Sequence, residues 1–263
     1  MKLAIIGGGN LGTAIALGLV KSGTNASTIS ITRRNLFKID HLKKDGFALT
    51  TNNIEAIKDA SVIFLCVQPK QLSHLLDEIR SSLKPEQILV STITGISTEE
   101  IAQHAAVKIP IIRAMPNTAI AIGKSMTCLC AKDADEKHLS VVKNIFNKLG
   151  ETLVIEERLM KAATVLAASG IAFAMRYIRA ATQGGIQMGF DAEEAQLIAA
   201  QTASGAASLL LTRESHPEME IDKVTTPEGC TIAGLNEMEH QGLSSALIKG
   251  IITSFDRINN IKK

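Results

Sequence analysis

Apolar and polar positions follow two alternating periods along the first 155 or so residues of the chain. Stretches with apolar residues at helical spacing, such as 11–21 and 72–83, alternate with short apolar runs. Such runs are typical of buried strands, and they lie at residues 3–6, 28–32, 62–67, 88–93, 111–114 and 152–155. This alternation predicts an α/β fold, with a parallel sheet covered by helices on both faces.

The pattern changes near residues 156–158, after which helical periodicity dominates and strand-like alternation is scarce. The helical segments expected there are residues 159–188, 192–212 and 232–258, with a polar connector before the last. We therefore predict two domains, an α/β domain of residues 1–156 and an all-helical domain of residues 157–263.

Charge and composition argue against nucleic-acid binding, a membrane segment and a metal site. Lys and Arg number 28 against 26 Asp and Glu, and aromatic residues make up only 3% of the chain, so neither a strong basic field nor stacking platforms favour nucleic-acid binding. The uncharged run 162–175 is shorter than the roughly 20 residues of a membrane span, and we expect no membrane segment. The four cysteines lack metal-ligand spacing, which favours reduced thiols, a cytoplasmic location and no metal.

A glycine-rich turn follows the first predicted strand. Residues 7–12 read Gly-Gly-Gly-Asn-Leu-Gly and match the G-x-G-x-x-G pattern that binds a dinucleotide pyrophosphate at the start of a helix. Because the turn lies between a strand and a helix and further strands follow, the sequence predicts a dinucleotide site. The alternative is a glycine-rich turn without a ligand.

The end of the second predicted strand indicates which dinucleotide binds. An NAD protein usually places a carboxylate there to hold the ribose 2′-hydroxyl, whereas this chain has Thr32, Arg33 and Arg34. Guanidinium groups suit a 2′-phosphate, so we expect NADPH, with NADH left open. A solvated surface pair of arginines is the alternative.

Several further motifs occur in a fixed order along the whole chain. They are residues 67–69, 112–118, 123–127, 156–160, 169–173, 185–189, 216–217 and 225–232. Together with the glycine turn they resemble the pyrroline-5-carboxylate reductases, which reduce a cyclic imine to proline with NAD(P)H. The segment Met-Pro-Asn-Thr at 115–118 and the Pro-x-Gly-x-Thr loop at 227–231 are the most specific.

The resemblance implies an oxidoreductase of proline biosynthesis with a Rossmann-type amino-terminal domain. It also implies that the helical domain intertwines with a second subunit, giving a homodimer or a larger assembly of dimers. The largely apolar tail agrees with this, because it carries more apolar surface than about a hundred residues of helix would hide. A compact monomeric helical bundle is the alternative.

The resemblance also assigns cofactor contacts. The glycine turn would hold the pyrophosphate, the two arginines the 2′-phosphate and Asn53 the adenosine ribose region, and the others would lie beside the cofactor. These residues are Gly7, Gly9, Asn10, Leu11, Gly12, Arg33, Arg34, Asn53, Val67, Gln68, Pro69 and Thr94. For Val67 and Thr94, packing at a strand end is an equally open interpretation.

Substrate contacts would come from Glu157, Glu214, Gly229, Cys230 and Thr231. Backbone N–H groups at a helix start would receive the substrate carboxylate, and Thr231 would hydrogen-bond the ring nitrogen during hydride transfer. Glu214 or a water molecule would supply the proton. Thr231 as a helix N-cap, and Glu157 and Glu214 as solvated carboxylates, are the alternatives.

Departures from the family pattern leave other functions open. Residues 167–173 lack a Pro and a Tyr hydroxyl that the family commonly has, and Glu228 adds a charge where Gly is usual. A related cyclic imine and a catalytically silent dinucleotide-binding paralogue therefore remain alternatives. A hydroxyacid dehydrogenase is disfavoured because no Lys follows Ser169 closely, and a Cys230 nucleophile because no base is fixed beside it. The exact imine, the oligomer size and feedback by proline stay open.

Overall fold

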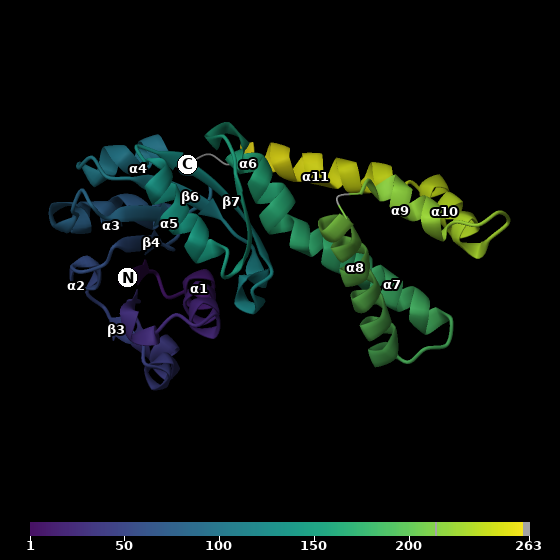
Figure 1. The fold of residues 1–263 in the computed structure, drawn as a ribbon, viewed down its shortest axis with the longest axis horizontal. Helices are drawn as coiled ribbons and strands as arrows, with labels where there is room; N and C mark the ends of the chain where they lie inside the picture. Colours follow the sequence, from purple (N-terminus) through teal and green to yellow (C-terminus); the bar gives the residue numbers. More distant parts are fainter. Residues whose placement is uncertain (214, 260–263) are drawn as a thin grey trace. The chain divides into compact units, whose positions relative to one another are not determined.

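The computed structural model describes residues 1–213 and 215–259 of the chain. The chain divides into two compact units (Figure 1), a first unit of Met1–Ser169 and a second unit that starts at Gly170. Each unit is described below by itself.

The first unit is built on a mixed eight-stranded sheet, counted over the described residues. Its strands are β1 (Leu3–Ile6), β2 (Ile29–Thr32), β3 (Ala48–Thr50), β4 (Val62–Leu65), β5 (Ile88–Ser91), β6 (Ile111–Met115), β7 (Ser125–Lys132) and β8 (Gly150–Val154). The order across the sheet is β3-β2-β1-β4-β5-β6-β7-β8, and every neighbouring pair is parallel except β6 and β7, which are antiparallel.

Helices cover both faces of this sheet. They are α1 (Asn10–Lys21), α2 (Asn53–Ile57), α3 (Leu72–Ile79), α4 (Thr98–Ala105), α5 (Glu136–Phe146) and α6 (Met160–Ala163). Segments of 3₁₀ helix connect several of them, at Ala26–Thr28, Leu36–Asp45, Pro69–Gln71, Arg80–Ser82, Thr118–Ile122 and Glu157–Leu159. A π-helical stretch, Thr164–Ser169, follows α6.

Alternation along the strands explains the two layers of core. Successive side chains of a strand point to opposite faces of the sheet. Ile5 and Phe64 accordingly pack in the cluster that includes α1 and α5, whereas Ala4 and Ile63 pack in the cluster that includes α3 and α4. Strands that are buried on both faces read as continuous apolar runs, which is the pattern seen in the sequence.

The second unit consists of helices α7 (Gly170–Gln187), α8 (Ala192–Arg213), α9 (Pro217–Val224), α10 (Cys230–His240) and α11 (Leu243–Asn259). Helices α7 and α8 run side by side as a hairpin (Figure 1), and α10 contacts α11. Among the described apolar residues of this unit, only Ala195 and Ala199 are buried. The second unit therefore has almost no hydrophobic core of its own.

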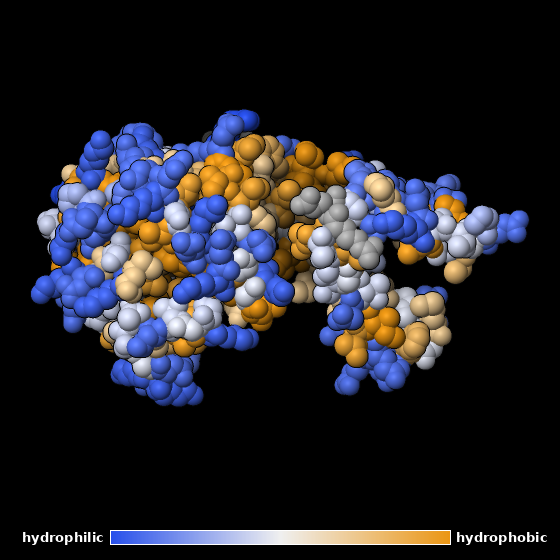
Figure 2. Space-filling model, viewed as in Figure 1, coloured by the Kyte–Doolittle hydropathy of each residue, from blue (hydrophilic) through white to orange (hydrophobic). Residues whose placement is uncertain are grey.

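Large apolar side chains instead lie on the surface of the second unit, and Figure 2 shows part of this surface. They come from all five helices, and they include Met175, Tyr177, Leu197, Ile198, Leu211, Met219, Val224, Met238, Leu247, Ile248 and Ile252. Leu211 is 79% exposed and Leu197 is 70% exposed. Exposed apolar area of this extent is typical of an interaction surface.

The predicted fold class is confirmed, and four details differ from expectation. Strand β3 is too short to give a sequence pattern, and β7 lies in a segment that we did not expect to be a strand. The expected helix 232–258 is two helices, broken where Gly242 adopts a φ of 83°. The polar connector contains α9. The domain boundary at residues 156 and 157 stays a prediction, since the compact units divide after Ser169.

The helical run Glu157–Gln187 is long and apolar enough to cross a membrane by length and composition. Its most apolar window has a mean hydropathy of 1.3 and is 17% buried. The expectation that run 162–175 falls short did not anticipate the helical turns that extend it on both sides. A single such helix, selected by length and composition alone, is weak evidence for a membrane span.

Phe146 of α5 should be important for the stability of the first unit. Its ring is fully buried and packs edge-on against Phe64, with the ring centroids 5.9 Å apart. Truncating a buried Phe leaves a cavity, so we expect Phe146→Ala to lower the free energy of unfolding by about 3–5 kcal/mol. Phe37, which is 89% exposed, is the matched control. Urea denaturation should leave Phe37→Ala near wild type, and equal effects of both variants would contradict this core assignment.

Candidate cofactor and active site

A pocket of about 780 Å³ opens at the carboxyl ends of β1, β2 and β4. The strand order reverses between β1 and β4, which is where open parallel sheets bind their ligands. The lining residues come from the three strand ends, from α2 and α3, and from the 3₁₀ helices Leu36–Asp45 and Pro69–Gln71. They are Ile6, Gly7, Gly8, Gly9, Thr32, Arg33, Arg34, Asn35, Lys38, Thr51, Asn53, Cys66, Val67, Gln68, Lys70, Gln71, His74, Leu75 and Glu78.

The glycines of the turn differ in what a side chain would meet at each position. Gly7 has a φ of +107°, and a Cβ there would lie 2.6 Å from the Cys66 carbonyl oxygen. A Cβ on Gly12 would lie 2.3 Å from the Gly7 carbonyl oxygen, so Gly12 lets α1 approach β1 closely. A Cβ on Gly9 would meet nothing within 4 Å, because it would project into open space.

The backbone amides at the start of α1 lie directly after this turn. Gly9 is the N-cap of α1 and makes no side-chain capping bond. The first helical hydrogen bond runs from the Thr13 amide to the Gly9 carbonyl, at 2.9 Å. The amides of the first turn, which a helix leaves without backbone partners, can therefore bind an anion such as a pyrophosphate.

Cationic side chains form the rim of the pocket. Arg33 and Arg34 were expected from the sequence, and the structure adds Lys38 and Lys70. The Arg33 Nη1 donates a hydrogen bond of 2.5 Å to the Gly8 carbonyl. Lys38 was not predicted from the sequence, because it lies beyond the end of β2. The 3₁₀ helix Leu36–Asp45 returns the chain to the pocket and brings Lys38 with it.

Asn53 lies where the pocket meets α2, as expected for a residue near the adenosine ribose. Its Nδ2 donates to both carboxylate oxygens of Glu78, at 3.0 and 3.2 Å. Glu78 and the neighbouring His74 belong to α3, and neither was singled out from the sequence.

Only some of the other predicted cofactor residues line the pocket. Val67 and Gln68 line the pocket, directly after β4. Pro69 and Thr94 are exposed and do not line it. Asn10, Leu11 and Gly12 form the first turn of α1 beside it. Their roles stay predictions.

Cys66 also lines the pocket, but its thiol is not poised to react. Burial raises the pKa of this thiol to about 11, against a small opposing effect of the Thr92 hydroxyl. Because the thiolate is the nucleophilic form, Cys66 acts here as a small packing residue.

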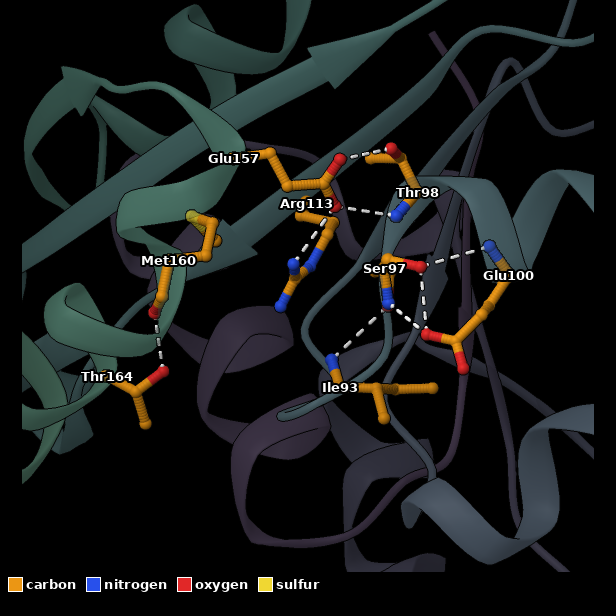
Figure 3. Close-up of polar contacts among 9 residues, drawn as sticks. Ile93, Ser97, Thr98, Glu100, Arg113, Glu157, Met160 and Thr164 are labelled. Atoms are coloured by element: carbon orange, nitrogen blue, oxygen red, sulfur yellow. Dashed lines mark hydrogen bonds and ion pairs between the residues drawn. The ribbon is translucent and has the colours of Figure 1, made fainter. Parts of the chain in front are cut away.

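Glu157 is the centre of a second polar cluster, shown in Figure 3. Its Oε1 accepts from the Thr98 amide at 2.7 Å and from the Arg113 Nη1 at 3.1 Å, and its Oε2 accepts from the Thr98 hydroxyl at 2.5 Å. Thr98 is the first residue of α4, so the carboxylate also lies at the positive end of that helix. Arg113 comes from β6 and is 5% exposed.

The hydrogen bonds of this cluster lower the pKa of the Glu157 carboxyl. Partial burial raises the pKa of the Glu157 carboxyl, but the hydrogen bonds from Thr98 and Arg113 outweigh burial and hold that pKa below its usual value. Both oxygens are engaged within the first unit, so Glu157 is not a freely solvated carboxylate. Its expected contact with substrate stays a prediction.

Asn117 explains part of the motif at 115–118. Its Nδ2 donates to the Ala167 carbonyl at 3.0 Å, and its Oδ1 accepts from the Ala119 amide at 3.0 Å. Ala167 lies in the π-helical stretch Thr164–Ser169, where the backbone bonding pattern is widened. The motif therefore anchors the helix at the point where this chain departs from the family sequence.

The expected substrate loop forms the start of α10 in the second unit. Gly229 is its N-cap without a side-chain bond, and Thr231 is the second helical residue, so the N-cap alternative for Thr231 is wrong. Glu228 is exposed at a φ of +57°. Cys230 is exposed, and none of the described residues hydrogen-bonds its thiol. Glu214 lies outside the described residues.

Comparison with known proteins identifies the family. The family model "Pyrroline-5-carboxylate reductase dimerisation" matches residues 157–261, and "NADP oxidoreductase coenzyme F420-dependent" matches residues 2–95. Pyrroline-5-carboxylate reductase 2 of Dictyostelium discoideum is 47% identical, over 97% of this chain and 91% of its own length. The chain belongs to the pyrroline-5-carboxylate reductase family.

Other relatives agree with this family assignment. Pyrroline-5-carboxylate reductase 1 of the same organism is 50% identical over 97% of this chain, which spans about half (49%) of that relative's length. A Coxiella burnetii pyrroline-5-carboxylate reductase has a TM-score of 0.91 and 27% identity, covering 100% of this chain and 98% of its own. The Plasmodium falciparum enzyme, solved with NADP bound, shares the fold at a TM-score of 0.87 and 21% identity, covering 98% and 97%. The prediction of an NAD(P)H-dependent oxidoreductase of this family is confirmed.

Gly12 and Gly9 should fail in different ways when replaced by Ala. We expect Gly12→Ala to lower the thermal midpoint by several degrees, since its Cβ would collide with the Gly7 carbonyl. Gly9→Ala should keep the midpoint and weaken NADPH binding at least tenfold, because its Cβ would occupy open space where we expect the pyrophosphate to lie. Thermal unfolding and equilibrium titration with NADPH separate the two effects. Tight NADPH binding by Gly9→Ala would contradict the pyrophosphate site.

The lowered pKa of Glu157 predicts a pH-dependent contribution to stability. The contribution is fully present above the unfolded pKa, near 4.5, and is lost as the pH falls through the lower folded pKa. At neutral pH we expect Glu157→Gln to cost about 1–2 kcal/mol, with the difference from wild type shrinking below about pH 4.5. Glu156→Gln, next to it in an exposed pair with Arg158, is the control. A pH-independent difference in denaturation midpoint would contradict this role.

Proposed function

We propose that this chain reduces 1-pyrroline-5-carboxylate to L-proline by hydride transfer from NADPH. The observation that carries the coenzyme assignment is the pocket at the β1 and β4 ends, where a glycine turn lies beside cationic side chains and β2 ends without a carboxylate. The family assignment supports the imine as substrate, since the relatives are named for it.

The residues present fit a dinucleotide. The open space over Gly9 and the uncapped start of α1 suit a pyrophosphate, and the arginines after β2 suit a 2′-phosphate better than a ribose hydroxyl. Asn53, Val67 and Gln68 would line the adenosine and ribose portions. Once bound, the coenzyme supplies the hydride.

The start of α10 supports the proposed substrate site. Its N-cap Gly229 has no side-chain bond, so the amides of Cys230 and Thr231 can receive a carboxylate. A Cβ on Gly229 would lie 2.4 Å from the Thr226 hydroxyl oxygen, so the tight turn before the helix needs a glycine there. Glu228, immediately before it, has an exposed side chain.

In the proposed mechanism Thr231 orients the ring and favours the protonated imine. A protonated ring nitrogen makes the imine carbon a good hydride acceptor, and the Thr231 hydroxyl would hydrogen-bond that nitrogen as its charge is lost. An alcohol with an ordinary high pKa is a poor acid, so Glu214 or water would supply the proton. Glu157 would hold the start of α4 in place and lie beside the substrate region.

We further propose that the second unit pairs with the same unit of a second copy, giving a cytoplasmic homodimer or larger assembly. The exposed apolar side chains of α7 to α11, and the near absence of a core in this unit, support a partner that covers them. The dimerisation family match over residues 157–261 supports the same assignment and a domain boundary at residues 156 and 157. The apolar exposure of Glu157–Gln187 would then be met by protein rather than by a membrane.

NADPH oxidation followed by absorbance tests the activity. We expect turnover with 1-pyrroline-5-carboxylate, and at least tenfold less with a six-membered cyclic imine acid or a 3-keto acid. Thr231→Ala should lower kcat about tenfold or more while NADPH affinity is kept, because one hydrogen bond at the reacting nitrogen is lost. Thr231→Ser, which keeps the hydroxyl, should recover most of the rate.

Three outcomes would overturn parts of this proposal. Turnover only with the six-membered imine would assign a related substrate. NADPH binding without any turnover would assign a silent dinucleotide-binding paralogue. An unchanged kcat in Thr231→Ala would remove Thr231 from the mechanism.

A further inference from the structure

The two arginines after β2 are held differently. Arg33 is half-buried, and its Nη1 donates to the Gly8 carbonyl at 2.5 Å. Its backbone amide donates to the Thr50 carbonyl at 3.3 Å, which ties the same residue to β3. Arg34 is exposed, and no described residue makes a hydrogen bond or ion pair with its guanidinium.

The Arg33 bond acts on the glycine turn itself. The Gly8 carbonyl and the Gly9 amide belong to one planar peptide group, and the Gly9 amide donates to the Gly7 carbonyl at 2.8 Å. The Gly8 amide donates to the Thr32 carbonyl at 2.7 Å. Arg33 thus completes a set of bonds that fixes the peptide planes leading into α1, whose first amides face the ligand.

Lys38 is a further cation at the pocket rim. Asn35 caps the 3₁₀ helix Leu36–Asp45 by accepting from the Phe37 amide at 3.1 Å. Lys38 lies in the first turn of that helix, lines the pocket and is exposed. No described residue pairs with its ammonium group. Among the lining residues the one acid is Glu78, on α3, whose carboxylate accepts from Asn53.

We propose that Arg33 is a positioning residue for the glycine turn, and that Arg34 and Lys38 provide the selectivity for a 2′-phosphate. This assignment rests on the proposed NADPH site and divides its two arginines by role. A residue that holds the turn affects any dinucleotide, since NADH and NADPH share the pyrophosphate. A residue that contacts only the 2′-phosphate affects NADPH alone.

Equilibrium titration with NADPH and with NADH, each at the same ionic strength, tests the division. Methionine substitutions remove each charge and keep the length of the side chain. We expect Arg34→Met and Lys38→Met each to raise the Kd of NADPH about tenfold and to leave the Kd of NADH within about twofold. Arg33→Met should raise both constants by similar factors, so their ratio stays within about twofold of wild type.

Lys44→Met is the matched control. Lys44 lies in the same 3₁₀ helix, is exposed and does not line the pocket, so its loss changes the net charge alone. We expect both constants to remain near wild type. If Arg33→Met does not fold, Arg33→Lys keeps a single donor for the Gly8 carbonyl, and we expect it to retain NADPH over NADH selectivity.

Two results would overturn the inference. A loss of NADPH affinity alone in the Arg33 variants would make Arg33 a direct phosphate ligand, and unchanged NADPH affinity in Lys38→Met would remove Lys38 from the site. Failure of the proposed function gives a different result, because the wild-type chain would then bind neither coenzyme, or would bind NADPH without reducing any imine.

Discussion

The close approach of α1 to β1 is the constraint on which the cofactor site depends. The approach exists because Gly12 has no side chain to meet the Gly7 carbonyl, and because Gly7 can adopt a positive φ next to Cys66. It brings the first amides of α1 to the edge of the sheet between β1 and β4, where the strand order reverses. These amides have no partners within the helix, so they are free to bind an anion at this edge of the sheet.

The two units differ in how much of their apolar side-chain surface they bury. The first unit buries apolar residues on both faces of its sheet and so has a complete core. In the second unit the helices leave most of their large apolar side chains on the surface. Burial of such area is the dominant favourable contribution to folding, so the second unit gains little stability from burial within itself.

Glu157 shows how a carboxylate can connect parts of the chain that are far apart in sequence. It joins the start of α4, the buried Arg113 of β6 and the first turn of the helical run. An ion pair that is partly removed from water contributes little net free energy to folding. It forms only when both groups are held in a favourable orientation. The cluster therefore ties the first turn of the helical run to α4 and β6, close in sequence to the π-helical stretch that Asn117 holds.

The features that depend on local pattern could be predicted from the sequence alone. The alternation of apolar runs and helical stretches gave the sheet with its helices, and residues 7–12 gave the dinucleotide turn, because spacing and glycine content are local properties. Strands β3 and β7 lacked so clear a pattern. Three contacts became visible only in the folded chain: Arg33 binds the Gly8 carbonyl, Lys38 returns to the pocket, and Glu157 pairs with Thr98 and Arg113. These contacts join distant residues, and side-chain direction across such distances is set by packing, which no local pattern encodes.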